Sequence, residues 1–216
     1  MSYRITIPSS DSPWLTPLPP MATPQHGGDL LRAKRRYPQV DHWLDLSAAL
    51  NPQPYPVPDI PPSCFQQLPD GYEPLLTAAA SYYRQQNLWP INGSQQGIEL
   101  LPGLYGGTGG NRAEKRVAVP DEGYQEHAWC WQKNGFSVYR YRADSPEALI
   151  GIAAQCDVLV VVNPNNPTGQ LFDRNTLLAC HHALQAKSGW LVVDEAFIDA
   201  FTTDEQQELS VSDAAC

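Results

Sequence analysis

The sequence lacks long apolar runs. None of its hydrophobic stretches approaches the roughly 20 residues that a transmembrane helix needs. Residues 1–20 contain one arginine and no apolar segment of the kind that a secretory signal requires. We therefore expect a cytoplasmic protein that has no membrane partner.

Positive charge is also scarce. The 216 residues include 14 Lys+Arg and 23 Asp+Glu, which gives a formal net charge of −9. A nucleic-acid partner is not expected, because binding to phosphate backbones needs a basic face. Hydrophobic residues make up 42% of the chain and aromatic residues 10%, which is enough apolar surface for a folded core. These numbers favour a globular protein that acts on a small molecule.

Patterns typical of disulfide frameworks and metal sites are missing as well. The five cysteines are odd in number and widely spaced, without a CxxC pair. The five histidines show no metal-ligand spacing, and the adjacent His181 and His182 would point about 100° apart on a helix. We expect reduced cysteines and no metal.

Proline is concentrated near the N-terminus, where residues 1–62 hold thirteen of the 21 prolines. Because proline fixes φ and removes a hydrogen-bond donor, residues 12–24 and 51–62 should be extended or turning segments. A short basic helix is expected between them, at residues 29–37. We predict that residues 1–62 form a Pro-rich N-terminal arm.

Strand and helix patterns alternate along the second half of the chain. Strands are expected at residues 116–119, 137–141, 157–162 and 189–193, and helices at 125–134, 145–155 and 174–187, the last capped by Asp173. The continuous apolar run at 158–162 is typical of a strand buried on both faces, as in parallel sheets. This alternation predicts an α/β fold with a parallel sheet. Helical patterns at 73–87 and 94–101 precede it, followed by a Gly-rich loop at 103–110, and residues 202–216 are expected to be a polar tail without a strong helix.

Two polar motifs directly follow expected strands. The first, NPNNPTG at residues 163–169, combines a rigid turn with asparagine donors, although it could also be only a tight strand-to-helix connection. The second, DEAF, begins with Asp194. An acid that ends a buried strand is costly without a cationic partner, and a pyridinium nitrogen would be such a partner. A helix N-cap is the alternative role for Asp194.

A third motif, NGSQQGI at residues 92–98, opens an expected helix. The free backbone amides and positive dipole of a helix start form a ready phosphate site, but a simply capped helix has the same appearance. The glycines at 103–110 lack both the Lys-Ser/Thr ending of a P-loop and the context of a dinucleotide site.

Together the three motifs resemble the class I/II aminotransferase family of fold-type I pyridoxal-phosphate enzymes, in which NPNNPTG and DEAF occur in this order and separation. Further segments resemble the histidinol-phosphate-aminotransferase-like branch and a decarboxylase subgroup of it: His26-Gly27-Gly28, Asp45-Leu46-Ser47, Asn51-Pro52, Leu68-Pro69-Asp70 and DEAFID at 194–199. The resemblance covers about residues 25–201. It implies a three-layer α/β/α large domain with a mainly parallel sheet. Residues 63–201 would form part of this pyridoxal-phosphate-binding domain, incomplete at its C-terminal end, residues 202–216 the polar tail, and the C-terminal small domain would be absent.

The resemblance also implies roles for single residues. Backbone amides of Ser94 and Gln95 would hold the cofactor phosphate, and Tyr124 would stack on the pyridine ring. Asn166 would donate a hydrogen bond to the ring hydroxyl oxygen, and Asp194 would pair with the ring nitrogen. For Tyr124, a place in the core is the alternative.

The N-terminal arm would contribute His26, Ser47 and Asn51, which by resemblance close over the substrate; ordinary packing within the arm is the alternative. Phe197 stands where aminotransferases of this branch often have a tyrosine that contacts the ring hydroxyl oxygen. Phenylalanine cannot make that contact, and it matches the decarboxylase subgroup better.

The lysine that forms a Schiff base with the cofactor in this family has no counterpart in the sequence. That lysine follows the strand-end aspartate in a Ser-x-x-Lys-like setting, whereas the lysines here (34, 115, 133 and 187) all precede Asp194. The resemblance implies a homodimeric enzyme that decarboxylates L-threonine O-3-phosphate to (R)-1-amino-2-propanol phosphate in cobalamin biosynthesis, with this chain inactive by itself. The alternatives are an aminotransferase of the histidinol-phosphate type and a non-catalytic remnant of the fold.

Overall fold

The computed structural model describes residues 13–47, 51, 53–66, 68, 71–106 and 111–213. Pro52, Pro69, Asp70 and residues 107–110 of the expected motifs lie outside the described residues. The chain divides into two compact units, the first made of Met1–Ala22 with Glu73–Cys216 and the second of Thr23–Tyr72. The three motifs that follow strands or open a helix all belong to the first unit.

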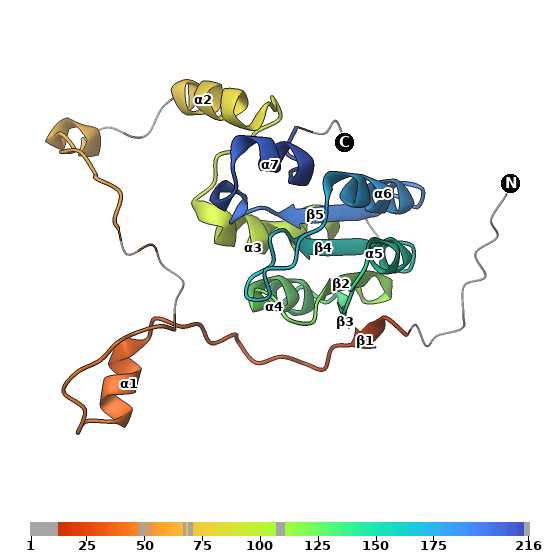
Figure 1. Ribbon diagram of the computed structural model, residues 1–216, viewed down its shortest axis with the longest axis horizontal. Coiled ribbons are helices and arrows are strands. Elements are labelled where there is room, and N and C mark those ends of the chain that lie inside the picture. Colours follow the sequence, from red (N-terminus) through yellow and green to blue (C-terminus); the bar gives the residue numbers. More distant parts are fainter. Residues whose placement is uncertain are drawn as a thin grey trace, which may run out of the picture. The chain divides into compact units, whose positions relative to one another are not determined.

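A five-stranded sheet forms the centre of the first unit (Figure 1), in the order β1-β3-β2-β4-β5. Four strands are parallel to one another, as the sequence predicts: β2 (Arg116–Pro120), β3 (Ser137–Tyr141), β4 (Val158–Val162) and β5 (Trp190–Asp194). The short strand β1 (Leu15–Pro17) pairs antiparallel with β3. The sequence predicts only an extended arm there, because a three-residue strand between prolines has no periodicity to detect.

The helices of the first unit are α2 (Glu73–Tyr83), α3 (Gly93–Gly106), α4 (Gln125–Lys133), α5 (Pro146–Ala153), α6 (Arg174–Gln185) and α7 (Thr203–Leu209), with the 3-10 turns η2 (Arg112–Glu114) and η3 (Ile198–Ala200). The Asp173 cap of α6 is confirmed, since its carboxylate accepts a hydrogen bond from the amide of Thr176 at 2.7 Å. None of the helices in the described ranges is long and apolar enough to cross a membrane.

Two predictions about these helices were wrong. The loop expected from residue 103 is helical as far as Gly106, because Pro102 and Tyr105 are buried and Tyr105 packs against Trp131 and Trp190. Tertiary packing here outweighs the low helix propensity of proline and glycine. The tail, expected to lack a strong helix, contains the seven-residue helix α7, which begins with a capping box between Thr202 and Glu205.

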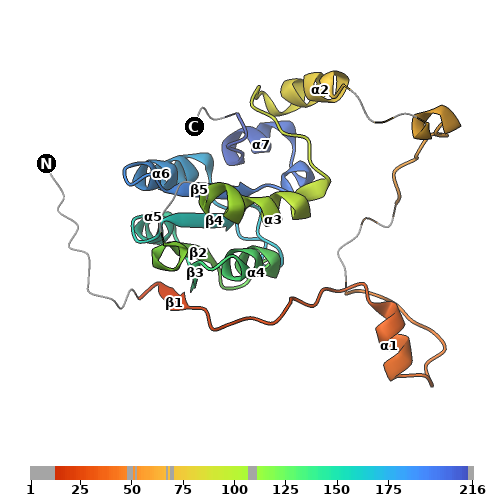
Figure 2. The same cartoon turned by 180° about the vertical axis from the view of Figure 1, so that it is seen from behind.

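Apolar side chains from the two faces of the sheet enter two separate cores. Along β4, Leu159 and Val161 pack with α5 and α6, whereas Val158 and Val160 pack with α3 and α4. Side chains alternate between faces along a strand, so a fully buried strand must be apolar at every position. Helices therefore cover both faces (Figures 1 and 2), which confirms the three-layer α/β/α fold.

The second unit contains one α-helix, α1 (Leu30–Arg36), and one 3-10 turn, η1 (Pro62–Phe65), among its described residues. The short basic helix is confirmed, and the side chain of Asp29 caps it by accepting a hydrogen bond from the amide of Arg32 at 3.0 Å. The turns around this helix bring Gly28 to Ser47, whose hydroxyl accepts a hydrogen bond from the Gly28 amide at 2.7 Å.

Candidate active site

The connections of the parallel strands create a crevice at their carboxyl ends. From β2 the chain passes to α4 on one face of the sheet, and from β4 to α6 on the other face. Loops that leave in opposite directions open a crevice between the two strands, and ligands of α/β proteins bind in such crevices. Tyr124 follows β2, Asn166 follows β4 and Asp194 is the last residue of β5, so all three belong to this end of the sheet.

Asp194 ends β5 with its carboxylate mostly buried. His127 of α4 is 2% exposed, and its Nε2 lies 2.9 Å from Asp194 Oδ2. The amide of Ala196 donates a second hydrogen bond to Oδ1 at 3.1 Å. Burial by itself would raise the pKa of Asp194, but the hydrogen bond and charge of His127, together with the Ala196 amide, outweigh burial and lower that pKa. Asp194 is thus held as an anion.

The asparagines of the NPNNPTG loop have different surroundings. Asn163 is fully buried and exchanges two hydrogen bonds of 2.9 Å with the backbone of Phe172. The amide of Asn165 donates to the Glu122 carbonyl at 2.7 Å and to the Thr168 hydroxyl at 2.6 Å. Asn166 is half-buried, and its side chain has no hydrogen-bond partner among the described residues. The tight-turn alternative thus describes Asn163 and Asn165 and leaves the amide of Asn166 for another partner.

Helix α3 starts beside Asp194. A cavity of about 440 Å³ is lined by Ser94, Gly97 and Ile98 of α3, by His127, and by Asp194 and Ala196. Gly93 has a positive φ of 78°, and a Cβ built there would have no atom within 4 Å, so the backbone is open at the helix start. The first amides of a helix have no intrahelical acceptor and attract anions. The volume is in the range of small-molecule sites.

Tyr124 and Gln95 contact each other at the same end of the unit. The Tyr124 hydroxyl donates a hydrogen bond to Gln95 Oε1 at 3.1 Å, and the Tyr124 ring lies edge-on to the His127 ring at 6.4 Å between centroids. Tyr124 is 37% exposed, so it is not the core aromatic that was the alternative. Burial raises its pKa, and the charges of Glu126 and Asp194 add to the increase.

The structure therefore brings Ser94 and Asp194 to one cavity and connects Gln95, Tyr124, His127 and Asp194 through successive contacts. Gln95, Tyr124 and Asn166 are not among the described residues that line that cavity. These residues fit pyridoxal phosphate: an open helix start faces the cavity, and a mostly buried carboxylate is kept ionised where a pyridinium would need it. Neither Lys115, bound to Asp157, nor Lys187, bound to the Ala153 carbonyl, lines the cavity.

Sequence reasoning missed His127, which it considered only as a metal ligand. The available signal is helical spacing, since His127 stands four residues before the buried Trp131 and so shares its face of α4. Its Nδ1 is buried without a hydrogen-bond partner in the described structure, while Nε2 is hydrogen-bonded to Asp194. Only the fold reveals this long-range pairing.

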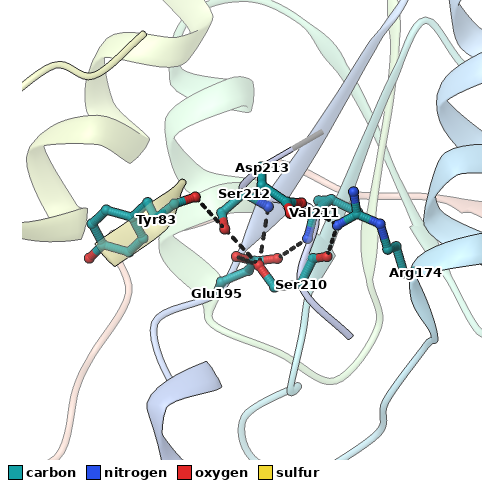
Figure 3. Close-up of polar contacts among 7 residues, drawn as sticks. All are labelled: Tyr83, Arg174, Glu195, Ser210, Val211, Ser212 and Asp213. Atoms are coloured by element: carbon teal, nitrogen blue, oxygen red, sulfur yellow. Dashed lines mark hydrogen bonds and ion pairs between the residues drawn. The ribbon is translucent and has the colours of Figure 1, made fainter. Parts of the chain in front are cut away.

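Glu195, the next residue, makes different contacts (Figure 3). Its carboxylate accepts hydrogen bonds from the Val211 amide and the Ser210 hydroxyl, both at 2.8 Å. Arg174 donates to the Ser210 carbonyl at 2.6 Å and also pairs with Asp213. Burial raises the pKa of Glu195, although these hydrogen bonds and Arg174 oppose the increase. Residues 210–213 are thereby held beside the end of β5.

The arm residues belong to the second unit. Ser47 donates its hydroxyl to Asp45 at 2.6 Å and accepts from Gly28, next to His26 and Gly27. A Cβ on Gly27 would lie 1.7 Å from the Ser47 carbonyl oxygen, so this approach requires glycine. Asn51 accepts a hydrogen bond from the Gln53 amide at 2.9 Å. The substrate roles of His26, Ser47 and Asn51 stay predictions.

Comparison with known proteins identifies the class. The family model for aminotransferase class I and II matches residues 65–214, and the chain belongs to this family. Its members are pyridoxal-phosphate enzymes.

Individual members of the family show which of its enzymes the chain is similar to. The chain is 42% identical to the threonine-phosphate decarboxylase of Pseudomonas aeruginosa over 81% of this chain and 50% of the relative. It is 31% identical to the histidinol-phosphate aminotransferase of Streptomyces avermitilis, over 79% and 53% of the two chains. The fold resembles the histidinol-phosphate aminotransferase of Sinorhizobium meliloti in complex with pyridoxal-5'-phosphate, with a TM-score of 0.52 and 21% identity over 61% and 36% of the chains. The chain spans about half the length of the curated relatives it matches.

Proposed function

We propose that this chain is the cofactor-binding part of a cytoplasmic, homodimeric enzyme that decarboxylates L-threonine O-3-phosphate to (R)-1-amino-2-propanol phosphate in cobalamin biosynthesis. One observation carries the proposal: Asp194 is held as a carboxylate by His127 in a cavity that the start of α3 also lines. The 42% identity to a threonine-phosphate decarboxylase supports this choice of reaction.

Each residue of the site has a defined task in this proposal. The amides of Ser94 and Gln95 bind the cofactor phosphate, Tyr124 stacks on the ring, Asn166 donates to the ring hydroxyl oxygen, and Asp194 keeps the ring nitrogen protonated. Bound pyridoxal phosphate supplies an electron sink for the pair released when the Cα–carboxylate bond breaks. In the same proposal, His26, Ser47 and Asn51 contact the substrate.

The chain by itself should bind the cofactor without turnover, because Lys115 and Lys187 are engaged elsewhere and no lysine is among the described residues that line the cavity. Titration of the chain with pyridoxal phosphate, followed by quenching of tryptophan fluorescence, tests binding. Asp194→Asn should weaken binding by about tenfold or more, because a charge-assisted contact is lost. Equal affinity of the two proteins would refute the role of Asp194. A stoichiometric borohydride-trapped adduct on one of the four lysines would refute non-covalent binding.

The alternative reaction is amino transfer from a histidinol-phosphate-type amine, which the 31% identical aminotransferase supports. A fusion of this chain to the C-terminal half of the Pseudomonas relative would separate the two reactions. Release of carbon dioxide from L-threonine O-3-phosphate supports the proposal. Conversion of 2-oxoglutarate to glutamate with histidinol phosphate would support the alternative instead.

A further inference from the structure

The side chain of Gln95 joins two helices of the candidate site. Gln95 lies in the first turn of α3, and its Oε1 accepts the hydrogen bond from the Tyr124 hydroxyl at 3.1 Å. Its Nε2 donates to Glu99 Oε1 at 3.1 Å and to Glu126 Oε2 at 3.3 Å. Glu126 belongs to the first turn of α4 and is only 8% exposed.

These partners fix the orientation of the amide. The amide nitrogen of Gln95 is a donor and carboxyl oxygens are acceptors, so the nitrogen faces Glu99 and Glu126. The reverse orientation would place the amide oxygen against two carboxylates. The oxygen therefore faces Tyr124, and the phenol must act as the donor. The Tyr124 hydroxyl is thus directed toward the Gln95 oxygen.

We propose that Gln95 is a positioning residue, which holds Tyr124 at a set distance from the start of α3. The inference rests on the proposed function, in which the α3 amides bind the phosphate and Tyr124 stacks on the ring of the same cofactor. The Gln95 side chain then sets the distance between the phosphate-binding amides of α3 and the Tyr124 ring. A ligand that carries both a ring and a phosphate gains affinity from this spacing, because the Tyr124 side chain does not have to be ordered when the ligand binds.

A first experiment needs no cofactor. The chain is labelled with 3-fluorotyrosine, and the 19F resonance of Tyr124 is assigned by its disappearance in Tyr124→Phe. Gln95→Ala should shift and sharpen this resonance, because the ring is no longer held. Gln96→Ala is the matched control: Gln96 accepts a hydrogen bond from the Asn92 amide at 2.7 Å, so this variant loosens the same helix start and leaves the hydrogen bond between Tyr124 and Gln95 in place. An unchanged Tyr124 resonance in Gln95→Ala, or an equal change in Gln96→Ala, would overturn the proposal.

A second experiment measures pyridoxal-phosphate affinity in a double-mutant cycle. Gln95→Ala and Tyr124→Phe should each weaken binding by about 3- to 10-fold, as for one neutral hydrogen bond, and the double variant by no more than either alone. Additive losses would show that Gln95 does not act through the Tyr124 hydroxyl. Asp194→Asn serves as the separate test of the proposed function. If the wild-type chain binds no cofactor, the proposed function fails, and the fluorine result decides whether Gln95 positions Tyr124.

Discussion

Replacement of His127 by phenylalanine should reverse the pH dependence that Asp194 gives to stability. The imidazole is 2% exposed and 2.9 Å from the carboxylate. Phenylalanine keeps most of the ring volume, so the packing change is small. The loss of a hydrogen bond to a charged group should lower the free energy of unfolding by about 1.5–3 kcal/mol at neutral pH.

The sign of the pH effect follows from the pKa of Asp194. In the wild type that pKa is below its usual value of 3.8, so the carboxylate stabilises the fold above the unfolded-state pKa, and this contribution is lost as the pH falls through the folded pKa. In His127→Phe, burial remains and only the Ala196 amide supports the charge, so the folded pKa rises above its usual value. Asp194 then stabilises the fold below the unfolded pKa, and the contribution is lost as the pH rises through the folded pKa.

Urea unfolding followed by tryptophan fluorescence between pH 3 and pH 5 measures the difference. The stability gap between wild type and His127→Phe should widen as the pH rises across this window, which lies below the range in which an ordinary histidine titrates. His182→Phe, at an exposed position of α6, is the control and should give a constant offset. A gap that stays constant for His127→Phe would show that the histidine does not control Asp194 and would refute the electrostatic argument.

Three further predictions concern the frame around the site. Leu159→Ala, at a fully buried position of β4, should lower the free energy of unfolding in urea by about 2–5 kcal/mol. Leu104→Ala, at a position 62% exposed on α3, should change it by less than about 0.5 kcal/mol. Equal effects of the two substitutions would contradict the assigned core. Gln132→Ala removes bonds to the backbone of residues 18–21 and should speed hydrogen exchange there while β4 stays protected, so uniform acceleration would contradict a local role. The raised pKa of Glu195 means that its contribution to stability is present below the unfolded pKa and lost as the pH rises through the folded pKa. The stability of wild type relative to Glu195→Gln should therefore decrease between pH 4 and pH 7, and an increase would contradict this assignment.

The sequence predicts the four parallel strands because each is marked by an apolar run or alternation bounded by turn residues. It does not predict strand order, since pairing partners are set by crossovers and packing on both faces. The strand β1 and the C-terminal end of α3 were missed for a related reason. Both contain residues of low intrinsic propensity, and contacts distant in sequence hold them in place.

Part of the candidate site could also be predicted. The strand-end position of Asp194 and the helix start at Ser94 are local patterns, and the structure places both residues at one cavity. His127 is different, because its role depends on a contact 67 residues away. The side-chain role of Gln95 likewise depends on Glu126, which only the packing of α3 against α4 brings near.

The buried amide of Asn163 has a thermodynamic consequence for Asn166. Its two hydrogen bonds to Phe172 close residues 163–172 into a hydrogen-bonded ring. The conformational entropy of that ring is lost during folding. A ligand that contacts Asn166 binds to a loop that is already ordered, so little of the binding free energy is lost in ordering the loop.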